Sequence, residues 1–387
     1  MNEARRDEPS WEPRRVLIER PGLPIDRRSF LVGSAGIAGL AALAGCGSSG
    51  SSQPSLSSGS SGPVTPASVT LLLDFLPNVD DVFIAVAEKY GYFADEKLTV
   101  TTTNPSVAQI NSIPELTGLG RFDFGIQSVP VGMFAYKAGS PVLAVAGWGQ
   151  RAEGIISLPK NTVTGPHSLV GKTVATYNAA DYKAFVISFM KSAGLSVDQV
   201  NLVNTNFTPP IIASGRAYAG LGIKWGELID TESYAKGPVD FLPFYNGRGN
   251  YGIPQMNYLL LFTAKSYAAK NGDIVKRMVR ALARGYKKAY TLIDSQLSPI
   301  MNTWCSTGPN KTGDLPTNMK KFNAGRSVAF YGSNQDPHTA TYFQQPLNSL
   351  PVIAKWLEST GVVTSMGNLS SFATNAYLTP GALHPSV

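Results

Sequence analysis

The stretch that decides the fold is residues 69–93, which read VTLLLDFLPNVDDVFIAVAEKYGYF. Its first seven residues form a nearly continuous apolar run, which predicts a buried β-strand. A Pro-Asn turn follows, and apolar residues at helical spacing over 81–90 predict a helix that ends at Gly91. A buried strand, a tight turn and an amphipathic helix together form one α/β unit.

The same alternation continues along the chain in both directions from this unit. Further strands are expected at 98–102, 122–126, 142–148, 169–175, 200–203, 219–223, 239–244 and 258–262. Helices are expected at 110–118, 129–138, 181–193, 273–295 and 347–360. Strands that alternate with helices through short Gly/Pro turns indicate parallel sheets covered on both faces. The pattern restarts near residue 169, which indicates a second α/β unit inserted into a first.

The N-terminal 45 residues are interpreted as a twin-arginine lipoprotein signal. Arg27 and Arg28 precede a short, weakly apolar stretch that ends in Leu-Ala-Gly-Cys at 43–46. This order of charge, apolar run and small residues predicts cleavage before Cys46 and a lipid on its thiol. The alternative, a buried cysteine in a helix, fits this order less well. Residues 46–66 are rich in Ser, Gly and Pro and are expected to form a flexible tether.

The composition and the motifs of the chain limit the classes of function that the sequence indicates. The net charge is +7, and no run of Lys and Arg interleaved with aromatic residues occurs, so nucleic-acid binding is not indicated. If Cys46 carries a lipid, Cys305 has no partner for a disulfide. The three histidines stand far apart, without metal-ligand spacing, and neither a phosphate-binding loop nor a dinucleotide motif occurs. No metal or cofactor is expected, although a catalytic triad assembled from distant residues stays open.

An ordered set of short motifs resembles the thiamine-precursor and sulfonate binding proteins of ABC importers. The motifs are Leu-Asp-Phe-Leu-Pro-Asn at 73–78, Ala-Glu-Lys-Tyr-Gly-Tyr-Phe at 87–93, Leu-Thr-Val at 98–100, Arg-Phe-Asp-Phe-Gly-Ile at 121–126, Gly-Ser-Pro-Val at 139–142, Leu-Val-Gly-Lys at 169–172 and Tyr-Gly-Ile-Pro at 251–254. The resemblance covers about residues 69–360. Phe75, Leu76 and the stretch at 79–81 depart from the family pattern, which puts the ligand of the relatives in doubt for this chain.

The resemblance implies a type II periplasmic-binding fold, with two α/β lobes, two crossovers and a ligand cleft between the lobes. The first lobe is expected to comprise residues 67–160 and 258–387, and the second residues 161–257, with crossovers near 157–166 and 254–260. Ligands of such sheets bind beyond the carboxyl ends of the strands. Candidate ligand-binding residues at those ends are Asp74, Phe75, Asn78, Gln127, Ser128, Trp148, Gln150, Arg151, Tyr177, Tyr182, Trp225, Glu227 and Tyr251.

Two chemistries are weighed at this site. Aromatic side chains suit a flat ring, and Glu227 would accept N–H donors from an aminopyrimidine. Arg151 would instead pair with an anion such as a sulfonate or nitrate, unless it is a solvated surface charge. The leading hypothesis is a monomeric solute-binding lipoprotein on the outer face of the cytoplasmic membrane. It delivers a thiamine-type pyrimidine precursor to an ABC permease and ATPase; a secreted enzyme or a sensor on the same fold is the alternative.

Overall fold

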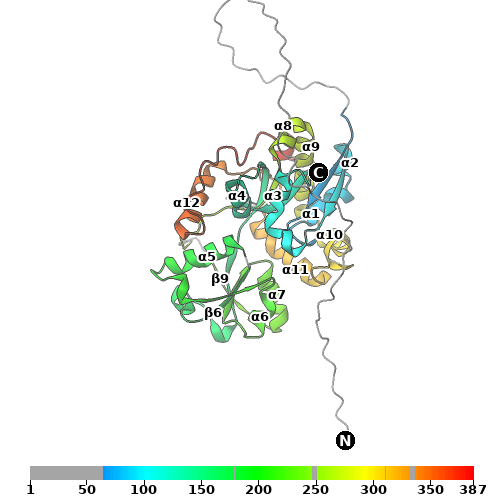
Figure 1. Cartoon of the computed structure of the whole chain (residues 1–387). Helices are drawn as coiled ribbons and strands as arrows, with labels where there is room; N and C mark the ends of the chain where they lie inside the picture. Colours follow the sequence, from blue (N-terminus) through cyan, green and yellow to red (C-terminus); the bar gives the residue numbers. More distant parts are fainter. Residues whose placement is uncertain (1–63, 178, 246–250, 310, 331–335) are drawn as a thin grey trace, which may run out of the picture. The chain divides into compact units, whose positions relative to one another are not determined.

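The computed structural model describes residues 64–387 except 178, 246–250, 310 and 331–335. The predicted signal with Arg27, Arg28 and Cys46, and most of the predicted tether, lie outside the described residues. Among the described residues, no helix combines the length and the apolar character needed to cross a membrane. Two five-stranded sheets organise this part of the chain (Figure 1).

The first lobe is built on a sheet with the strand order β2-β1-β3-β10-β4. Its strands are β1 (Ala67–Leu72), β2 (Leu98–Thr103), β3 (Phe124–Ser128), β4 (Val142–Gln150) and β10 (Asn257–Ala264). The first three are parallel, whereas β10 runs antiparallel to both β3 and β4. Side chains alternate between the faces of β10, so that Leu259 and Leu261 join one hydrophobic core and Leu260 and Phe262 another.

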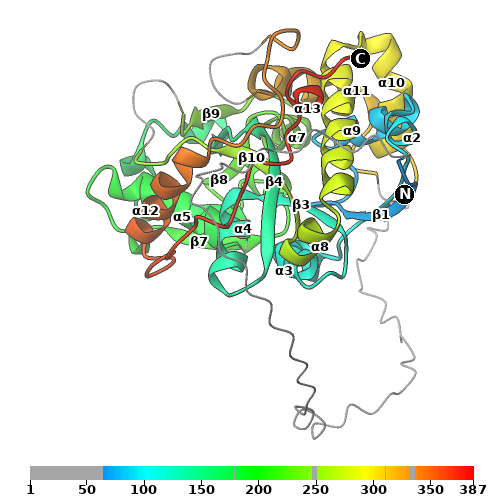
Figure 2. The same ribbon diagram turned by 90° about the horizontal axis from the view of Figure 1, so that it is seen from above.

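Helices cover both faces of this sheet (Figure 2). The helices of the first lobe are α1 (Val82–Lys89), α2 (Tyr92–Asp95), α3 (Ile113–Gly118), α4 (Val129–Lys137), α8 (Lys265–Lys270), α9 (Gly272–Thr291), α10 (Asp294–Met301), α11 (Leu315–Gly325) and α13 (Pro380–Leu383). The longest of them, α9, packs along α1 through its apolar stripe of Val275, Met278 and Leu282. The residues predicted as the first strand and helix therefore form the centre of this core.

The second lobe is built on a sheet with the strand order β7-β6-β8-β5-β9. Its strands are β5 (Glu153–Ser157), β6 (Thr173–Tyr177), β7 (Asn201–Thr205), β8 (Ala219–Ile223) and β9 (Asp240–Pro243), and its helices are α5 (Ala180–Lys191), α6 (Pro209–Ala213) and α7 (Glu227–Ala235). The expected inserted α/β unit is thus present. The first crossover differs from the expected position near 157–166, because β5 already pairs with β8 and β9 of the second sheet. Only residues 151–152 separate β4 from β5.

The C-terminal part of the chain returns to the second lobe, which the sequence did not indicate. Helix α12 (Leu350–Thr360) packs on α5, where the indole N–H of Trp356 donates to Ser188 Oγ at 2.6 Å. The chain then runs back to the first sheet, where the backbone N–H of Ala144 donates to the carbonyl of Phe372 at 2.9 Å. The prediction that all of 258–387 belongs to the first lobe therefore does not hold for α12, which packs on the second lobe.

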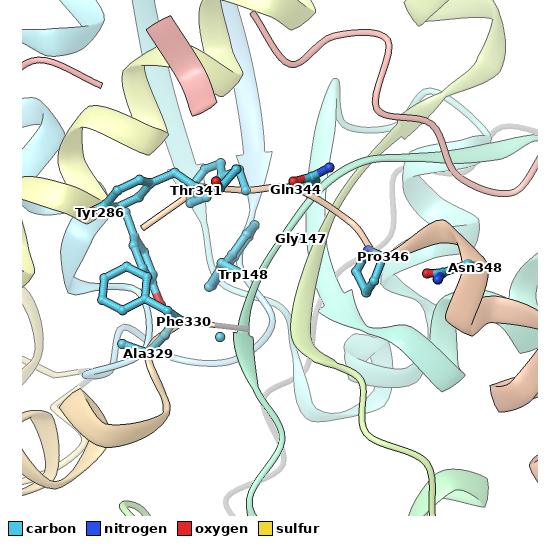
Figure 3. Close-up of a pocket in the computed structure, with 12 residues that line it drawn as sticks. Gly147, Trp148, Tyr286, Ala329, Phe330, Thr341, Gln344, Pro346 and Asn348 are labelled. Atoms are coloured by element: carbon cyan, nitrogen blue, oxygen red, sulfur yellow. The ribbon is translucent and has the colours of Figure 1, made fainter. Parts of the chain in front are cut away.

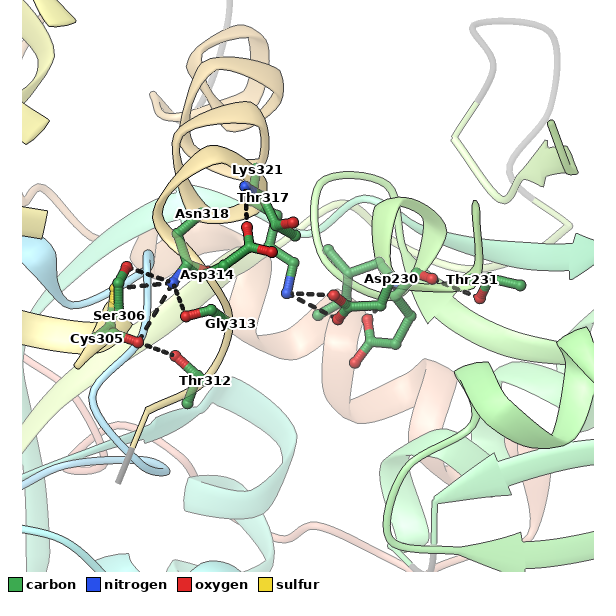
Figure 4. Close-up of polar contacts among 12 residues, drawn as sticks. Asp230, Thr231, Cys305, Ser306, Thr312, Gly313, Asp314, Thr317, Asn318 and Lys321 are labelled. Atoms are coloured by element: carbon green, nitrogen blue, oxygen red, sulfur yellow. Dashed lines mark hydrogen bonds and ion pairs between the residues drawn. The ribbon is translucent and has the colours of Figure 1, made fainter. Parts of the chain in front are cut away.

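A second contact joins α11 of the first lobe to α7 of the second (Figure 4). Lys321 Nζ lies 2.6 Å from an Asp230 carboxylate oxygen, and Lys320 Nζ lies 2.7 Å from Glu232. The Lys321 pair is nearly buried, whereas the Lys320 pair is largely exposed and screened by solvent. In the same helix, the Asn318 amide donates to Cys305 O and to Ser306 Oγ, which fixes the first turns of α11 against the π-helical segment Asn302–Ser306 that follows α10.

Candidate functional site

The loop between β1 and α1 brings three carboxylates to the junction of the lobes. Asn78 shapes this loop, since its side-chain oxygen accepts from the Asp80 N–H at 2.7 Å and its amide donates to the Leu76 carbonyl at 3.1 Å. Asp81 is fully buried, and among the described residues no N–H or O–H donor of another residue type reaches its oxygens or Asp74 Oδ1; the Asp74 and Asp81 carboxyl groups instead hydrogen-bond to each other through a shared proton. Phe75, by contrast, is 40% exposed.

Burial dominates the protonation of this acidic cluster of Asp74, Asp80 and Asp81. Desolvation raises the pKa of Asp74 to about 6. Desolvation, followed by the neighbouring charge of Asp74, raises the pKa of Asp80 to about 7 and that of Asp81 well above its usual range. At neutral pH, such a cluster is stabilised when its carboxyl groups are protonated, or when a ligand donates N–H groups to their oxygens.

Asp80 connects the two lobes. Its Oδ1 accepts the indole N–H of Trp225 at 2.7 Å, and its Oδ2 accepts the Tyr258 hydroxyl at 3.1 Å. The Trp225 and Tyr258 rings meet edge to face, with centroids 5.2 Å apart. Trp225 follows β8 of the second lobe, whereas Asp80 and Tyr258 belong to the first, so this contact forms only when the lobes are together.

Glu227 is the carboxylate that the second lobe contributes. Its Oε1 accepts the Tyr177 hydroxyl at 2.6 Å, and its Oε2 accepts the backbone N–H of Ile223 at 2.8 Å. The Tyr177 and Tyr182 rings lie 4.8 Å apart beside it. Burial and then the charge of Glu227 raise the pKa of Tyr177 well above its usual range, so Tyr177 stays a donor. A side chain at Gly222 would clash with Glu227, because an added Cβ would lie 2.5 Å from Glu227 Cβ.

Arg151 lies in the first crossover and is already neutralised. Its Nε donates to Glu153, and its Nη1 lies 3.2 Å from Asp181 Oδ2; all three side chains are at most 2% exposed. Its guanidinium also lies 4.9 Å from the centre of the Phe185 ring. Burial alone would lower the pKa of Arg151, but the charges of Glu153 and Asp181 raise it. Arg151 is therefore neither a solvated surface charge nor a free partner for an anion.

Gln127 and Ser128 stand where β3 meets α4, and they also face the crossover. The Gln127 amide donates to the Ile110 carbonyl at 2.7 Å and its oxygen accepts the Ser128 N–H at 2.7 Å. Ser128 Oγ contacts Asp181 Oδ2 at 3.4 Å, which links the two lobes a second time. Their polar groups are thus engaged within the protein.

The remaining predicted residues divide between the junction and the core. Trp148 is 4% exposed and stacks on Phe343 with centroids 5.2 Å apart. Gln150 ends β4 opposite Asn257 and is half-buried. Tyr251 packs against Phe189 at 4.8 Å, within the core of the second lobe, because the chain turns there with a positive φ of 51°. The structure therefore places Tyr251 away from the acidic cluster.

Two hollows meet at Trp148. The smaller one, of about 20 Å³, lies between the lobes and is lined by residues that include Asp80, Trp225 and Tyr258. The larger one, of about 400 Å³, lies on the first lobe between β4, α9 and residues of 329–330 and 341–348 (Figure 3). Among the residues with described positions, no group of three His, Cys, Asp or Glu side chains is arranged to hold a metal.

Sequence reasoning missed three of these residues. The sequence presents Asp80 and Asp81 only as a departure from the family pattern, although two adjacent acids in an apolar stretch are a signal in themselves. It predicts Tyr258 only as a strand residue; the position of Tyr258 at the start of β10, beside the second crossover, is the available signal.

A family model described as NMT1/THI5 like matches residues 78–292. The chain belongs to this family. The formylaminopyrimidine-binding protein of Halalkalibacterium halodurans is 26% identical to this chain over 60% of this chain and 70% of its own length.

The relatives include enzymes as well as binding proteins. The 4-amino-5-hydroxymethyl-2-methylpyrimidine phosphate synthase of Candida albicans is 24% identical over 73% of this chain and 84% of its own length. In structure, the chain resembles the alkanesulfonate-binding protein SsuA of Xanthomonas axonopodis bound to MOPS, with a TM-score of 0.58, 14% identity, and coverage of 80% of this chain and 98% of that one. This likeness confirms the periplasmic-binding-protein fold expected from the sequence.

Proposed function

We propose that this NMT1/THI5-like protein is an extracytoplasmic solute-binding protein that delivers a thiamine-type aminopyrimidine to an ABC importer. One observation carries the proposal: the half-buried carboxyl groups of Asp74 and Asp80 and the buried one of Asp81 lie beside aromatic side chains at the lobe junction, and no Lys or Arg of the described residues is paired with them. Flat rings bind between aromatic faces, and their N–H groups satisfy carboxylate acceptors.

The electrostatics disfavour an anionic solute. The sulfonate or nitrate alternative relied on Arg151, and that guanidinium already contacts Glu153 and Asp181. An anion placed near Asp80 would meet the negative charges that already raise the pKa of that group. An aminopyrimidine offers the opposite match, because its amino group donates and its ring nitrogen takes up a proton.

A binding measurement with the purified chain tests the proposal. Calorimetry with 4-amino-5-hydroxymethyl-2-methylpyrimidine should give saturable binding, whereas an alkanesulfonate and nitrate should give none. Asp80→Asn should weaken pyrimidine binding by at least about tenfold, as expected for loss of a hydrogen bond to a charged group. The exposed Asp198→Asn serves as the matched control. Tight binding of the sulfonate instead would overturn the assignment.

Anchoring is a separate part of the proposal. The Leu-Ala-Gly-Cys sequence at 43–46 and the Arg27-Arg28 pair support export followed by lipid attachment at Cys46. Cys46→Ser should release the protein from the membrane fraction, and replacing both arginines with lysine should block export. Unchanged membrane partition of Cys46→Ser would contradict the lipid anchor and leave the ligand assignment intact.

A further inference from the structure

The first sheet has one end at the lobe junction and another end on the opposite side of the first lobe. Strand β1 begins at this opposite end, where the backbone N–H of Ala67 donates to the Lys97 carbonyl at 2.9 Å. Strands β3 and β4 begin there too, because β3 is parallel to β1 and β10 is antiparallel to both β3 and β4. The junction residues Asp74, Ser128 and Gln150 follow or complete the other ends of these strands.

Basic residues are concentrated at the end opposite the junction. The segments that surround the strand starts, which we call the basic end, are 96–98, 119–123, 137–141 and 265–277. They contain seven basic and three acidic residues. The Lys265 N–H donates to the Pro141 carbonyl at 2.8 Å, and Arg277 Nη1 donates to the Glu96 carbonyl at 2.8 Å, which holds these segments together. Figure 2 shows α3 and α8 at this same end of the first lobe.

The three acids of the basic end are already engaged within the protein. Glu96 pairs with Arg280 at 2.6 Å, and Asp273 pairs with Arg277 at 2.8 Å. Asp123 accepts two hydrogen bonds from one residue of β1. The acids therefore do not neutralise the remaining basic side chains.

Five basic side chains of the basic end are exposed and have no carboxylate partner among the described residues. They are Lys97, Arg121, Lys137, Lys270 and Lys276. Like charges gathered on one surface create a field that attracts a partner of the opposite sign. The basic end therefore suits an anionic partner.

An apolar side chain protrudes among these basic residues. Leu119 follows α3, two positions before Arg121, and its 69% exposure is the highest of the large apolar side chains in the described part of the chain. Val64, three residues before β1, is 52% exposed. Glu115, one turn earlier in α3, is half-buried, and burial raises its pKa. Basic and protruding apolar side chains together match a bilayer surface, where charges meet anionic head groups and apolar groups reach the acyl boundary.

We propose that the basic end is a docking surface for an anionic lipid bilayer and that it turns the lobe junction away from the membrane. The inference rests on the proposed extracytoplasmic, anchored location and goes beyond it, because it assigns the face that meets the lipid. The six residues of β1 separate the junction from the head groups by about 20 Å. Since salt screens exposed charges, this attraction orients the protein without fixing it permanently.

Sedimentation with lipid vesicles tests the surface. The protein used is the processed chain from residue 46 onward with Cys46→Ser, so that neither a lipid nor the signal arginines contribute. It should bind vesicles of phosphatidylglycerol but not of phosphatidylcholine, and more weakly as the salt concentration rises. The triple variant Arg121→Gln, Lys137→Gln and Lys270→Gln should bind at least about tenfold more weakly, because each basic residue near an anionic surface contributes about fivefold.

The matched control removes the same charges from exposed positions of the second lobe. The triple variant Lys160→Gln, Arg216→Gln and Lys236→Gln should bind the vesicles as the parent protein does. Both triple variants should keep the parent's melting temperature and its affinity for 4-amino-5-hydroxymethyl-2-methylpyrimidine. If the parent binds vesicles but no pyrimidine, the proposed solute is overturned and the docking surface stands.

A fluorescent label reports the orientation on the vesicle. A label on Ala138→Cys, in the basic end, should be quenched by a quencher carried in the bilayer, whereas a label on Ser214→Cys, in the second lobe, should not; Cys305 is buried and stays unlabelled. Equal binding to the two lipids, equal losses in the two triple variants or equal quenching at the two sites would overturn the docking surface. Double-stranded DNA that binds as tightly as the vesicles would also overturn it, since that result indicates a general polyanion site.

Discussion

The lobe junction contains two clusters of ionisable side chains of opposite design. Arg151, Glu153 and Asp181 form a compensated cluster, in which the cation is paired with both acids, although Glu153 Oε2 has no hydrogen-bond partner among the described residues. Asp74, Asp80 and Asp81 form an uncompensated cluster, with which no Lys or Arg of the described residues is paired. Burial of charge without a partner is costly, and proteins retain it mainly where function requires it. The difference indicates that the first cluster maintains the crossover and that the second awaits a ligand.

The largest effect is expected at the compensated cluster. Arg151→Met leaves two buried carboxylates without their cation and should lower the free energy of unfolding by about 3–5 kcal/mol, measured by urea denaturation. Replacing the whole cluster, with Glu153→Gln and Asp181→Asn added to Arg151→Met, should restore most of this loss. A single variant as stable as wild type would mean that the crossover does not depend on the pair.

The uncompensated cluster should show itself in the pH dependence of stability. Because the folded-state pKa of Asp80 is raised from 3.8 to about 7, its stabilising contribution is fully present below about pH 4 and is lost as the pH rises to about 7. Asp74, with a pKa of about 6, acts in the same direction over a narrower window. The drop assigned to Asp80 should amount to roughly 2–4 kcal/mol.

Comparison of wild type with Asp80→Asn isolates that effect. Asparagine stays neutral, so the variant should overtake wild type in unfolding free energy as the pH rises from about 4 to about 7. Urea denaturation across this range measures the difference between the two proteins, in which titrating groups that do not interact with Asp80 cancel. If the unfolding free energies of the two proteins changed with pH in parallel, burial would not raise the pKa of Asp80.

The smallest effect is expected at Trp225, which connects the uncompensated cluster to the second lobe. Trp225→Phe removes the hydrogen bond to Asp80 but retains an aromatic edge against Tyr258, and should cost about 1 kcal/mol of stability. Ligand affinity should fall less than in Asp80→Asn, since the acceptor remains. A larger loss of affinity than in Asp80→Asn would move the centre of the site from the carboxylate to the indole.

Local pattern predicted most of the fold. The strand expected at 219–223 is β8, and the helix expected at 273–295 is α9 at 272–291, because burial imposes periods that a single sequence displays. The position of the first crossover was not predicted correctly, because the apolar pattern at 153–157 indicates a strand but not the sheet to which that strand belongs. The packing of α12 on α5 was not predicted for the same reason, because contacts between residues far apart in the sequence are not visible in the local hydrophobic pattern.

The site was predicted in outline only. The strand ends of Asp74, Trp225 and Glu227 follow from fold topology, and the structure brings these residues to the junction. The partners of Arg151 could not be predicted, because Glu153 and Asp181 come from separate elements of the second lobe. Tyr251 was misplaced because its backbone turns with a positive φ that redirects the side chain into the core.

The return of the chain to the second lobe through α12 bears on how the protein melts. Trp356, Phe185 and Phe372 belong to one hydrophobic cluster that includes residues of both sheets, such as Leu260 and Leu221. Neither sheet can lose its packing without exposing part of the other's core. Calorimetry should therefore record one heat-absorption peak with equal calorimetric and van't Hoff enthalpies, as for a single cooperative unit.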